Sequence, residues 1–138
     1  MKRVLVLASH HKMAEGLKDT LEFITGDVCQ TIAMAAYVDN SPIEDAIKNI
    51  VDGVDEEDEL VILTDLTSGS VNQQFFPYRN RPHTHIISGM NLPLAMQFAL
   101  EPQDDYMSAD TVRELVATAQ QEIKYVSDMT AAEDDEDE

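Results

Sequence analysis

Two adjacent histidines, His10 and His11, follow the apolar run of residues 4–8 after a single serine. The run is short, continuous and rich in Val and Leu, which is typical of a parallel strand covered on both faces. A helical pattern begins at once behind the histidines. They therefore belong to the loop at the carboxyl end of a strand, where open α/β sheets place ligands and reactive groups. We predict that one of these histidines carries phosphate.

A second segment, Asp65 to Ser70, combines a carboxylate with small hydroxyl residues and glycine, and it follows another apolar run. It is typical of a loop that delivers a helix N-terminus, whose free backbone N–H groups suit an anion. If the strand order is 2-1-3-4, both loops line one crevice and His10 meets Asp65. A carboxylate that accepts the Nδ1–H leaves the Nε2 lone pair free for attack on phosphorus and stabilises the resulting cation. The N–H groups around Gly69 and Ser70 could then hold the phosphoryl oxygens, and no metal or other cofactor is required.

Hydrophobic periodicity predicts the elements that position these loops. Strands are expected over residues 3–8, 28–36, 60–64 and 83–88, and helices over 13–25, 42–51 and 71–78, then a short one ending at 100 and a long one capped by Ser108. Asn40-Ser41 is expected to supply the cap of the second helix, with Pro42 at its first position. Right-handed crossovers then predict an α/β fold, a single doubly wound and mostly parallel sheet with helices on both faces. Residues 123–126 fit either a fading helix or a short strand.

Length, charge and cysteine content narrow the class of protein. A chain of 138 residues with 43% apolar content fits one domain. The formal charge of −18 argues against nucleic acid as a partner, because phosphate neutralisation needs clustered Lys and Arg. The single cysteine, Cys29, is expected in the core and excludes a disulfide. No signal peptide or membrane-length apolar run is seen, so we expect a cytoplasmic protein.

Three pieces of the sequence resemble the IIA domains of the mannose-type sugar phosphotransferase system (PTS). They are residues 8–17 (Ala-Ser-His-His and Ala-Glu-Gly-Leu), residues 63–70 (Leu-Thr-Asp-Leu-Thr-Ser-Gly-Ser) and residues 88–94 (Ser-Gly-Met-Asn-Leu-Pro-Leu). Each piece alone is a weak signal, whereas the three in this order are fairly specific. The resemblance implies a domain over residues 1–128, and we expect the acidic tail over 129–138 to be disordered.

The resemblance also implies roles. His10 would take phosphate from the phosphohistidine of the carrier HPr and pass it to a IIB partner, which serves the membrane IIC and IID subunits during sugar uptake. Asp65 would be the supporting acid and Ser70 the phosphate-contacting hydroxyl. Members are homodimers that exchange a C-terminal antiparallel strand, which would fall near residues 123–126. Two departures stand out: His11 occupies a position where glycine is usual, and Val71 replaces a proline.

Other functions remain open from the sequence. The phosphocarrier subunit of PTS-dependent dihydroxyacetone kinases shares the fold and the Ser-His after strand one. A response-regulator receiver would need an acidic pair after the first strand, where this chain has His10 and His11, and this argues against that function. A non-catalytic acidic binding module would take up no covalent phosphate. His83 and His85 are interpreted as structural, and Asp65 could merely cap its own turn.

Overall fold

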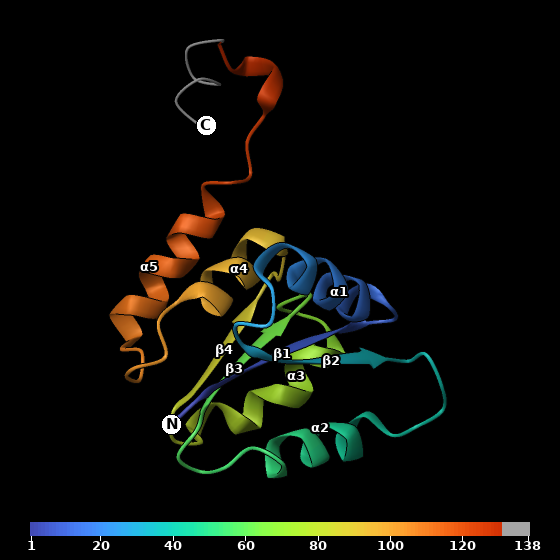
Figure 1. Ribbon diagram of the computed structural model, residues 1–138. Helices are drawn as coiled ribbons and strands as arrows, with labels where there is room; N and C mark the ends of the chain where they lie inside the picture. The colour runs from blue at the N-terminus through green and yellow to red at the C-terminus, as the bar shows by residue number, and fades with distance from the viewer. Residues whose placement is uncertain (131–138) are drawn as a thin grey trace.

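Four parallel strands form one sheet in the order β2-β1-β3-β4, as the sequence predicts (Figure 1). The computed structural model describes residues 1–130. The strands are β1 (Arg3–His10), β2 (Gln30–Ala36), β3 (Glu59–Thr64) and β4 (Thr84–Ser88). In this register His10 lies opposite Ala36 on β2, and Ala8 lies opposite Thr64 on β3. The loops that follow β1 and β3 therefore lie side by side at the carboxyl ends of two neighbouring strands.

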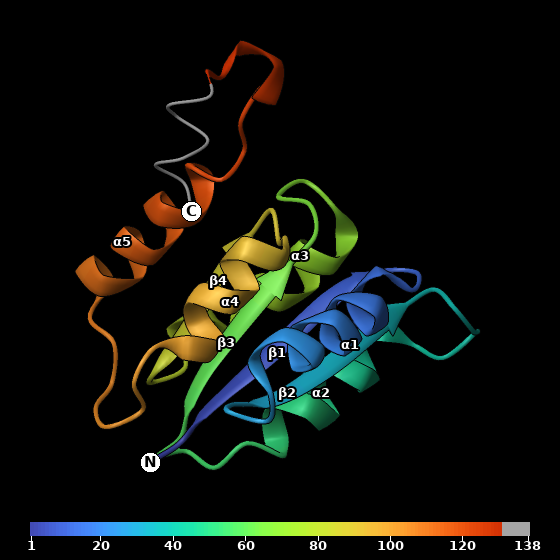
Figure 2. The ribbon, with the colours of Figure 1, turned by 45° about the horizontal axis from the view of Figure 1, so that its top comes forward.

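Helices cover both faces of the sheet (Figures 1 and 2). The α-helices are α1 (Met13–Thr25), α2 (Ile43–Asp52), α3 (Ser70–Phe75), α4 (Leu92–Leu100) and α5 (Ala109–Gln120). Two short 3-10 helices are η1 (Phe76–Asn80) and η2 (Val126–Asp128). Helices α1, α4 and α5 pack on one face, and α2 and α3 pack on the other. The helices that follow β1 and β3 thus lie on opposite faces, which makes the carboxyl ends of these two strands the switch point of the fold.

Alternate side chains of β1 belong to two separate cores. Leu5 and Leu7 pack with α1 and α4, whereas Val4 and Val6 pack with α2 and α3, and all four are at most 1% exposed. Full burial of such a side chain stabilises a protein by about 1.5–3 kcal/mol. A central strand buried on both faces is a rigid support for the residue at its end, here His10.

A buried ion pair lies at the opposite end of the sheet, where β1 and β3 begin. Arg3 Nε lies 2.7 Å from Glu59 Oε1, and both side chains are fully buried. The Arg3 guanidinium also donates to the carbonyl of Glu101, and Glu59 accepts from the backbone N–H of Met107. The link between α4 and α5 is therefore held by β1 and β3. Losing either charged partner leaves the other buried and unpaired, which typically costs about 3–5 kcal/mol.

Two helix boundaries differ from the sequence predictions. The α2 helix begins after Pro42, and neither Asn40 nor Ser41 caps it through a side chain; instead the Asp39 carboxylate accepts from the Ser41 N–H. The predicted helix over 71–78 is divided into α3 and η1. Pro77 explains the division, because it has no N–H to donate and its ring disfavours a continuing α-helix.

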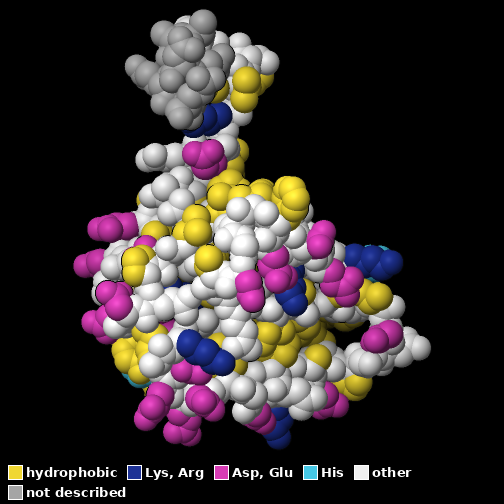
Figure 3. Space-filling view, in the orientation of Figure 1, with side chains coloured by type: hydrophobic (Ala, Val, Ile, Leu, Met, Phe, Trp, Pro, Cys, Tyr) yellow, Lys and Arg dark blue, Asp and Glu magenta, His cyan; other side chains and the backbone are white. Residues whose placement is uncertain are grey.

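The chain after α5 leads away from the sheet (Figures 1 and 2). Residues 123–125 are irregular and form no strand in the single chain, and Ile123, Tyr125 and Val126 are 67–77% exposed. An exchanged strand needs a second chain, so that expectation stays a prediction. From residue 131 onward, the predicted tail lies outside the described residues. Among residues 1–130 no helix is both long and apolar enough to span a membrane, and acidic side chains are visible over much of the face in Figure 3.

Candidate active site

His10 and Asp65 meet at the switch point of the sheet. His10 is the last residue of β1, and Asp65 directly follows β3. The Asp65 Oδ2 atom lies 2.8 Å from His10 Nδ1 and 2.8 Å from the His10 backbone nitrogen. One carboxylate oxygen therefore accepts from both the backbone and the ring of the same residue. This double contact restricts the ring's orientation more than a single bond would.

The ionisation of Asp65 determines which ring nitrogen of His10 carries a proton. Burial raises the pKa of the Asp65 carboxyl, but the hydrogen bonds from the backbone N–H and ring of His10 outweigh it and hold the pKa below its ordinary value. The carboxylate is therefore ionised near neutral pH and can only accept hydrogen bonds. It follows that Nδ1 carries the proton in the neutral ring, and that Nε2 presents a lone pair.

Ser70 faces this lone pair. As the first residue of α3, it places its Oγ atom 3.2 Å from His10 Nε2. The His10 side chain is 38% exposed, whereas that of Asp65 is only 11% exposed. The predicted neighbours on both sides of the imidazole are thus present around one ring.

Gly69 lets α3 approach the histidine closely. A Cβ atom at position 69 would lie 3.1 Å from His10 Cε1 and 3.2 Å from the Leu66 Cβ. Both distances are shorter than ordinary carbon contacts, so a side chain here would require the His10 ring and Leu66 to shift by a few tenths of an ångström. The Gly69 N–H itself donates to the Leu66 carbonyl at 3.2 Å, which closes the turn after Asp65. Gly69 therefore acts here through its missing side chain, and its N–H is already engaged.

His11 occupies a different position from His10. Its backbone has φ of 55°, in the left-handed region that glycine adopts readily, which agrees with the glycine that the family resemblance leads us to expect at this position. Its N–H donates to the Ala36 carbonyl at 2.7 Å, and its side chain is exposed. Of the two adjacent histidines, it is His10 that contacts Asp65 and Ser70.

Two residues that the sequence analysis did not assign support the site. Ser9 is fully buried, and its hydroxyl oxygen accepts from the Ala14 N–H at 2.8 Å, so it ties the end of β1 to the start of α1. Tyr37 directly follows β2, with its hydroxyl 2.7 Å from Ser70 Oγ and its ring centroid 5.5 Å from that of His10. The rule that located His10 and Asp65, a polar residue at the carboxyl end of a strand, also applies to Tyr37.

The two remaining histidines, His83 and His85, lie at the start of β4, at the opposite end of the sheet from His10. His83 stacks on Tyr106 with ring centroids 3.6 Å apart, and His85 Nε2 is 4.0 Å from the buried Glu59. These contacts agree with the structural interpretation of both. Within residues 1–130, no group of three or more His, Cys, Asp or Glu side chains is placed to hold a metal ion.

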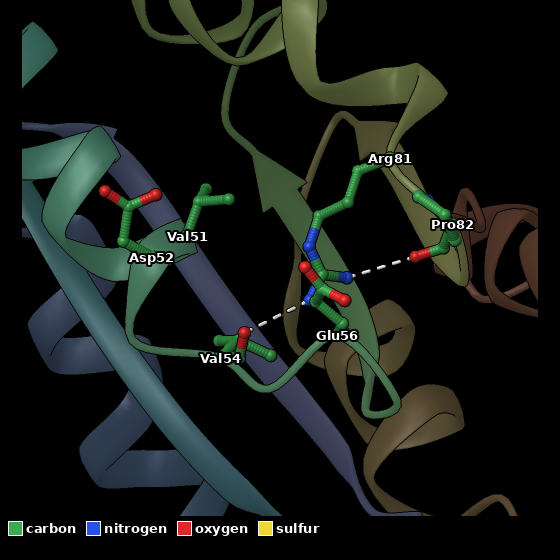
Figure 4. A pocket seen from close by; sticks show the side chains of 6 residues that line it. All are labelled: Val51, Asp52, Val54, Glu56, Arg81 and Pro82. Carbon is green, nitrogen blue, oxygen red and sulfur yellow. Dashed lines mark hydrogen bonds between the residues drawn. The ribbon is translucent and has the colours of Figure 1, made fainter.

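A cavity of about 460 Å³ also lies away from His10, beside the segments that enter β3 and β4 (Figure 4). Its lining residues are Val51, Asp52, Val54, Glu56, Arg81 and Pro82. The Arg81 guanidinium donates to the carbonyls of Val54 and Pro82, which the dashed lines mark. Arg81 thus braces two loops of the backbone, and none of the residues predicted to do chemistry lines this cavity.

The fold and site together define a doubly wound α/β protein with a histidine, an aspartate and a serine at the switch point. The family model for EIIA-man, the PTS system fructose IIA component, matches residues 4–120. The chain belongs to this family of phosphotransfer components, as the resemblance implied.

Solved structures agree with the family assignment. A Klebsiella pneumoniae protein assigned to a phosphoenolpyruvate-dependent sugar PTS permease is 31% identical, with 93% of each chain covered and a TM-score of 0.85. The PTS IIA protein associated with the fucose utilization operon of Streptococcus pneumoniae is 26% identical, with 92% of this chain and 95% of that chain covered and a TM-score of 0.77. The mannose/sorbose specific IIA subunit from Enterococcus faecalis, at 22% identity, 94% and 98% coverage and a TM-score of 0.76, shares the fold.

Proposed function

We propose that this protein is a cytoplasmic IIA phosphocarrier that accepts phosphate on His10 from phospho-HPr and passes it to a IIB subunit for sugar uptake. The observation that carries the proposal is the pairing of His10 Nδ1 with Asp65 at 2.8 Å, which leaves Nε2 facing Ser70 on a side chain that is 38% exposed. Family membership supports the phosphotransfer role.

Phosphoryl transfer to His10 follows from this arrangement. The Nε2 lone pair attacks phosphorus, the new N–P bond forms, and the P–N bond to the donor imidazole breaks, with its electron pair returning to the donor ring. The His10 ring becomes positively charged while Nδ1 keeps its proton. The Asp65 carboxylate stabilises that charge, and the Ser70 hydroxyl can donate to a phosphoryl oxygen. Transfer to the IIB partner runs the same steps in reverse.

The test is incorporation of label from phosphoenolpyruvate in the presence of enzyme I and HPr. We expect acid-labile phosphate on His10, followed by its loss when a IIB protein is added. Addition of a dihydroxyacetone kinase instead tests the alternative acceptor. A folded chain that takes up no label under these conditions is not a phosphocarrier, and a binding module would then be the better description.

We further propose that two chains form a homodimer by exchanging the segment over 123–126. Three apolar side chains of this segment are exposed in the single chain, and β4 is an edge strand that pairs only with β3 in the described sheet. Beside β4 lies a hollow of about 210 Å³ that Ile87, Leu94, Val116 and Ile123 help to line. An edge strand and an exposed apolar segment on one chain favour reciprocal pairing. A sedimentation mass equal to one chain at micromolar concentration would contradict the dimer.

A further inference from the structure

Tyr37 has an unusual backbone and a specific contact at the candidate active site. Its φ of 64° lies in the left-handed region, which bulky side chains rarely adopt. The preceding residue is held in place, because the Ala36 carbonyl accepts from the His11 N–H. This conformation coincides with a tilted ring contact to His10 and a 2.7 Å hydrogen bond to Ser70. A backbone outlier that delivers a side chain to a site is a reason to look for a role.

The direction of each hydrogen bond around His10 follows from Asp65. Because that carboxylate only accepts, the proton of the neutral ring is on Nδ1 and Nε2 must accept. Ser70 therefore donates its single hydroxyl proton to Nε2, and its oxygen is left as an acceptor. Tyr37 must then be the donor in the bond that joins the two hydroxyls. The result is a one-way chain of donors from Tyr37 through Ser70 to the nucleophilic nitrogen.

We propose that Tyr37 is a positioning residue for phosphoryl transfer, which orients the Ser70 hydroxyl by occupying one of its lone pairs. The proposal rests on the phosphocarrier function proposed above. With that lone pair occupied, the Ser70 proton points toward Nε2 and afterwards toward an oxygen of the phosphoryl group bound there. Tyr37 keeps its proton throughout, so the step involves no net proton transfer. A freely rotating serine would have to be oriented during each transfer, and this ordering is what Tyr37 supplies.

The obvious other role for Tyr37 is to shield one side of the imidazole. Tyr37→Phe separates the two roles, because it keeps the ring and removes only the hydroxyl. Loss of one net hydrogen bond predicts a decrease of roughly 2- to 12-fold in the rate of phosphoryl acceptance. Tyr78→Phe is the matched control, since its ring packs in the α2–α3 core and lies outside the site.

A double-mutant cycle tests whether Tyr37 acts through Ser70. We expect Tyr37→Phe to slow labelling by phospho-HPr, Ser70→Ala to slow it further, and the double variant to label at the same rate as Ser70→Ala, with no additional decrease from the change at Tyr37. The proposal is overturned if the effects of the two substitutions multiply in the double variant. It is also overturned if Tyr37→Phe labels as fast as wild type.

A second measurement is independent of phosphate. In ¹⁵N spectra of the unphosphorylated protein at about pH 8.5, two units above the reference pKa of histidine, the Nε2 resonance of His10 should move to higher frequency in Tyr37→Phe. A weaker hydrogen bond from Ser70 is the reason, and Tyr78→Phe should leave the resonance in place. If wild type accepts no label, the proposed phosphocarrier function fails and this spectrum alone decides the positioning of Ser70. An unchanged His10 Nε2 resonance in Tyr37→Phe refutes the proposal that Tyr37 orients Ser70.

Discussion

Asp65→Asn tests the electrostatic part of the site without changing its shape. The Asp65 carboxylate contacts His10 at two points, both 2.8 Å long. The asparagine oxygen can take the position of Oδ2 and accept both hydrogen bonds from His10, so the fold should persist. Its NH2 group cannot accept the bond that Asp65 Oδ1 accepts from the Leu66 N–H at 3.0 Å, so the turn loses one hydrogen bond. What disappears is the negative charge beside a ring that, in the proposed transfer, becomes cationic when its Nε2 atom attacks phosphorus.

The expected loss follows from the distance between the charges. Two unit charges about 4 Å apart interact by about 4 kcal/mol at an effective dielectric constant of 20. Each 1.4 kcal/mol is a factor of ten in rate, so about 10³-fold is an upper limit. The His10 side chain is 38% exposed, and solvent therefore reduces the interaction. We expect Asp65→Asn to slow phosphoryl acceptance by about 10²-fold.

Rapid-quench measurement of label transfer from phospho-HPr gives this rate directly. Circular dichroism and the urea midpoint show whether the variant is folded, and Asp19→Asn, an exposed charge change on α1, serves as the control. If folded Asp65→Asn accepts phosphate within about threefold of the wild-type rate, the electrostatic reasoning is wrong. Asp65 would then be a residue of the turn only.

Three further predictions address the neighbours of His10. His10→Gln should abolish acid-labile labelling while His11→Gln retains it, because only His10 contacts Asp65 and Ser70; the opposite pattern would move the active site by one residue. Gly69→Ala should slow phosphoryl acceptance about tenfold and cost about 1–3 kcal/mol of stability, because its Cβ would lie 3.1 Å from His10. Folding lowers the pKa of Asp65, so the ionised carboxylate stabilises the folded protein above the ordinary pKa of about 3.9. This stabilisation is lost as the pH falls through the lower pKa of the folded state. The urea midpoints measured at about pH 5 and pH 3 should therefore differ more for wild type than for Asp65→Asn.

Matched variants keep the glycine and pH predictions specific. Gly16→Ala lies in α1 with open space around its new Cβ, so it should leave the rate unchanged and stabilise the protein by about 0.5–1 kcal/mol. A slow Gly16→Ala would mean that any added methyl group impairs the assay. For the pH series, equal losses of stability in wild type and Asp65→Asn would show that other acidic groups dominate acid unfolding.

Much of the architecture could be predicted because it depends on local pattern. The apolar run of β1 and the helical spacing behind it mark a strand followed by a helix, and repetition of this unit with right-handed crossovers leaves few arrangements of the sheet. His10 and Asp65 were found for the same reason: each ends or directly follows such a strand. The helix ends were less accurate, as α3 and η1 show, because Pro77 acts within a single turn of an otherwise continuous pattern.

The sequence by itself predicted the type of fold and, for the strand order 2-1-3-4, the pair of residues that meets at the switch point. Only the tertiary structure decided what surrounds them. Tyr37 and Ser70 are 33 positions apart in the sequence, and Arg3 and the connection after α4 are about 100 apart. Neither contact can therefore be predicted from the hydrophobic periodicity of the sequence. Hydrophobic periodicity records which side of an element is buried, whereas the partners of a polar side chain depend on how separate elements pack in space. That is why the position of His10 could be predicted from the sequence, while the two hydroxyl groups beside its Nε2 atom could not.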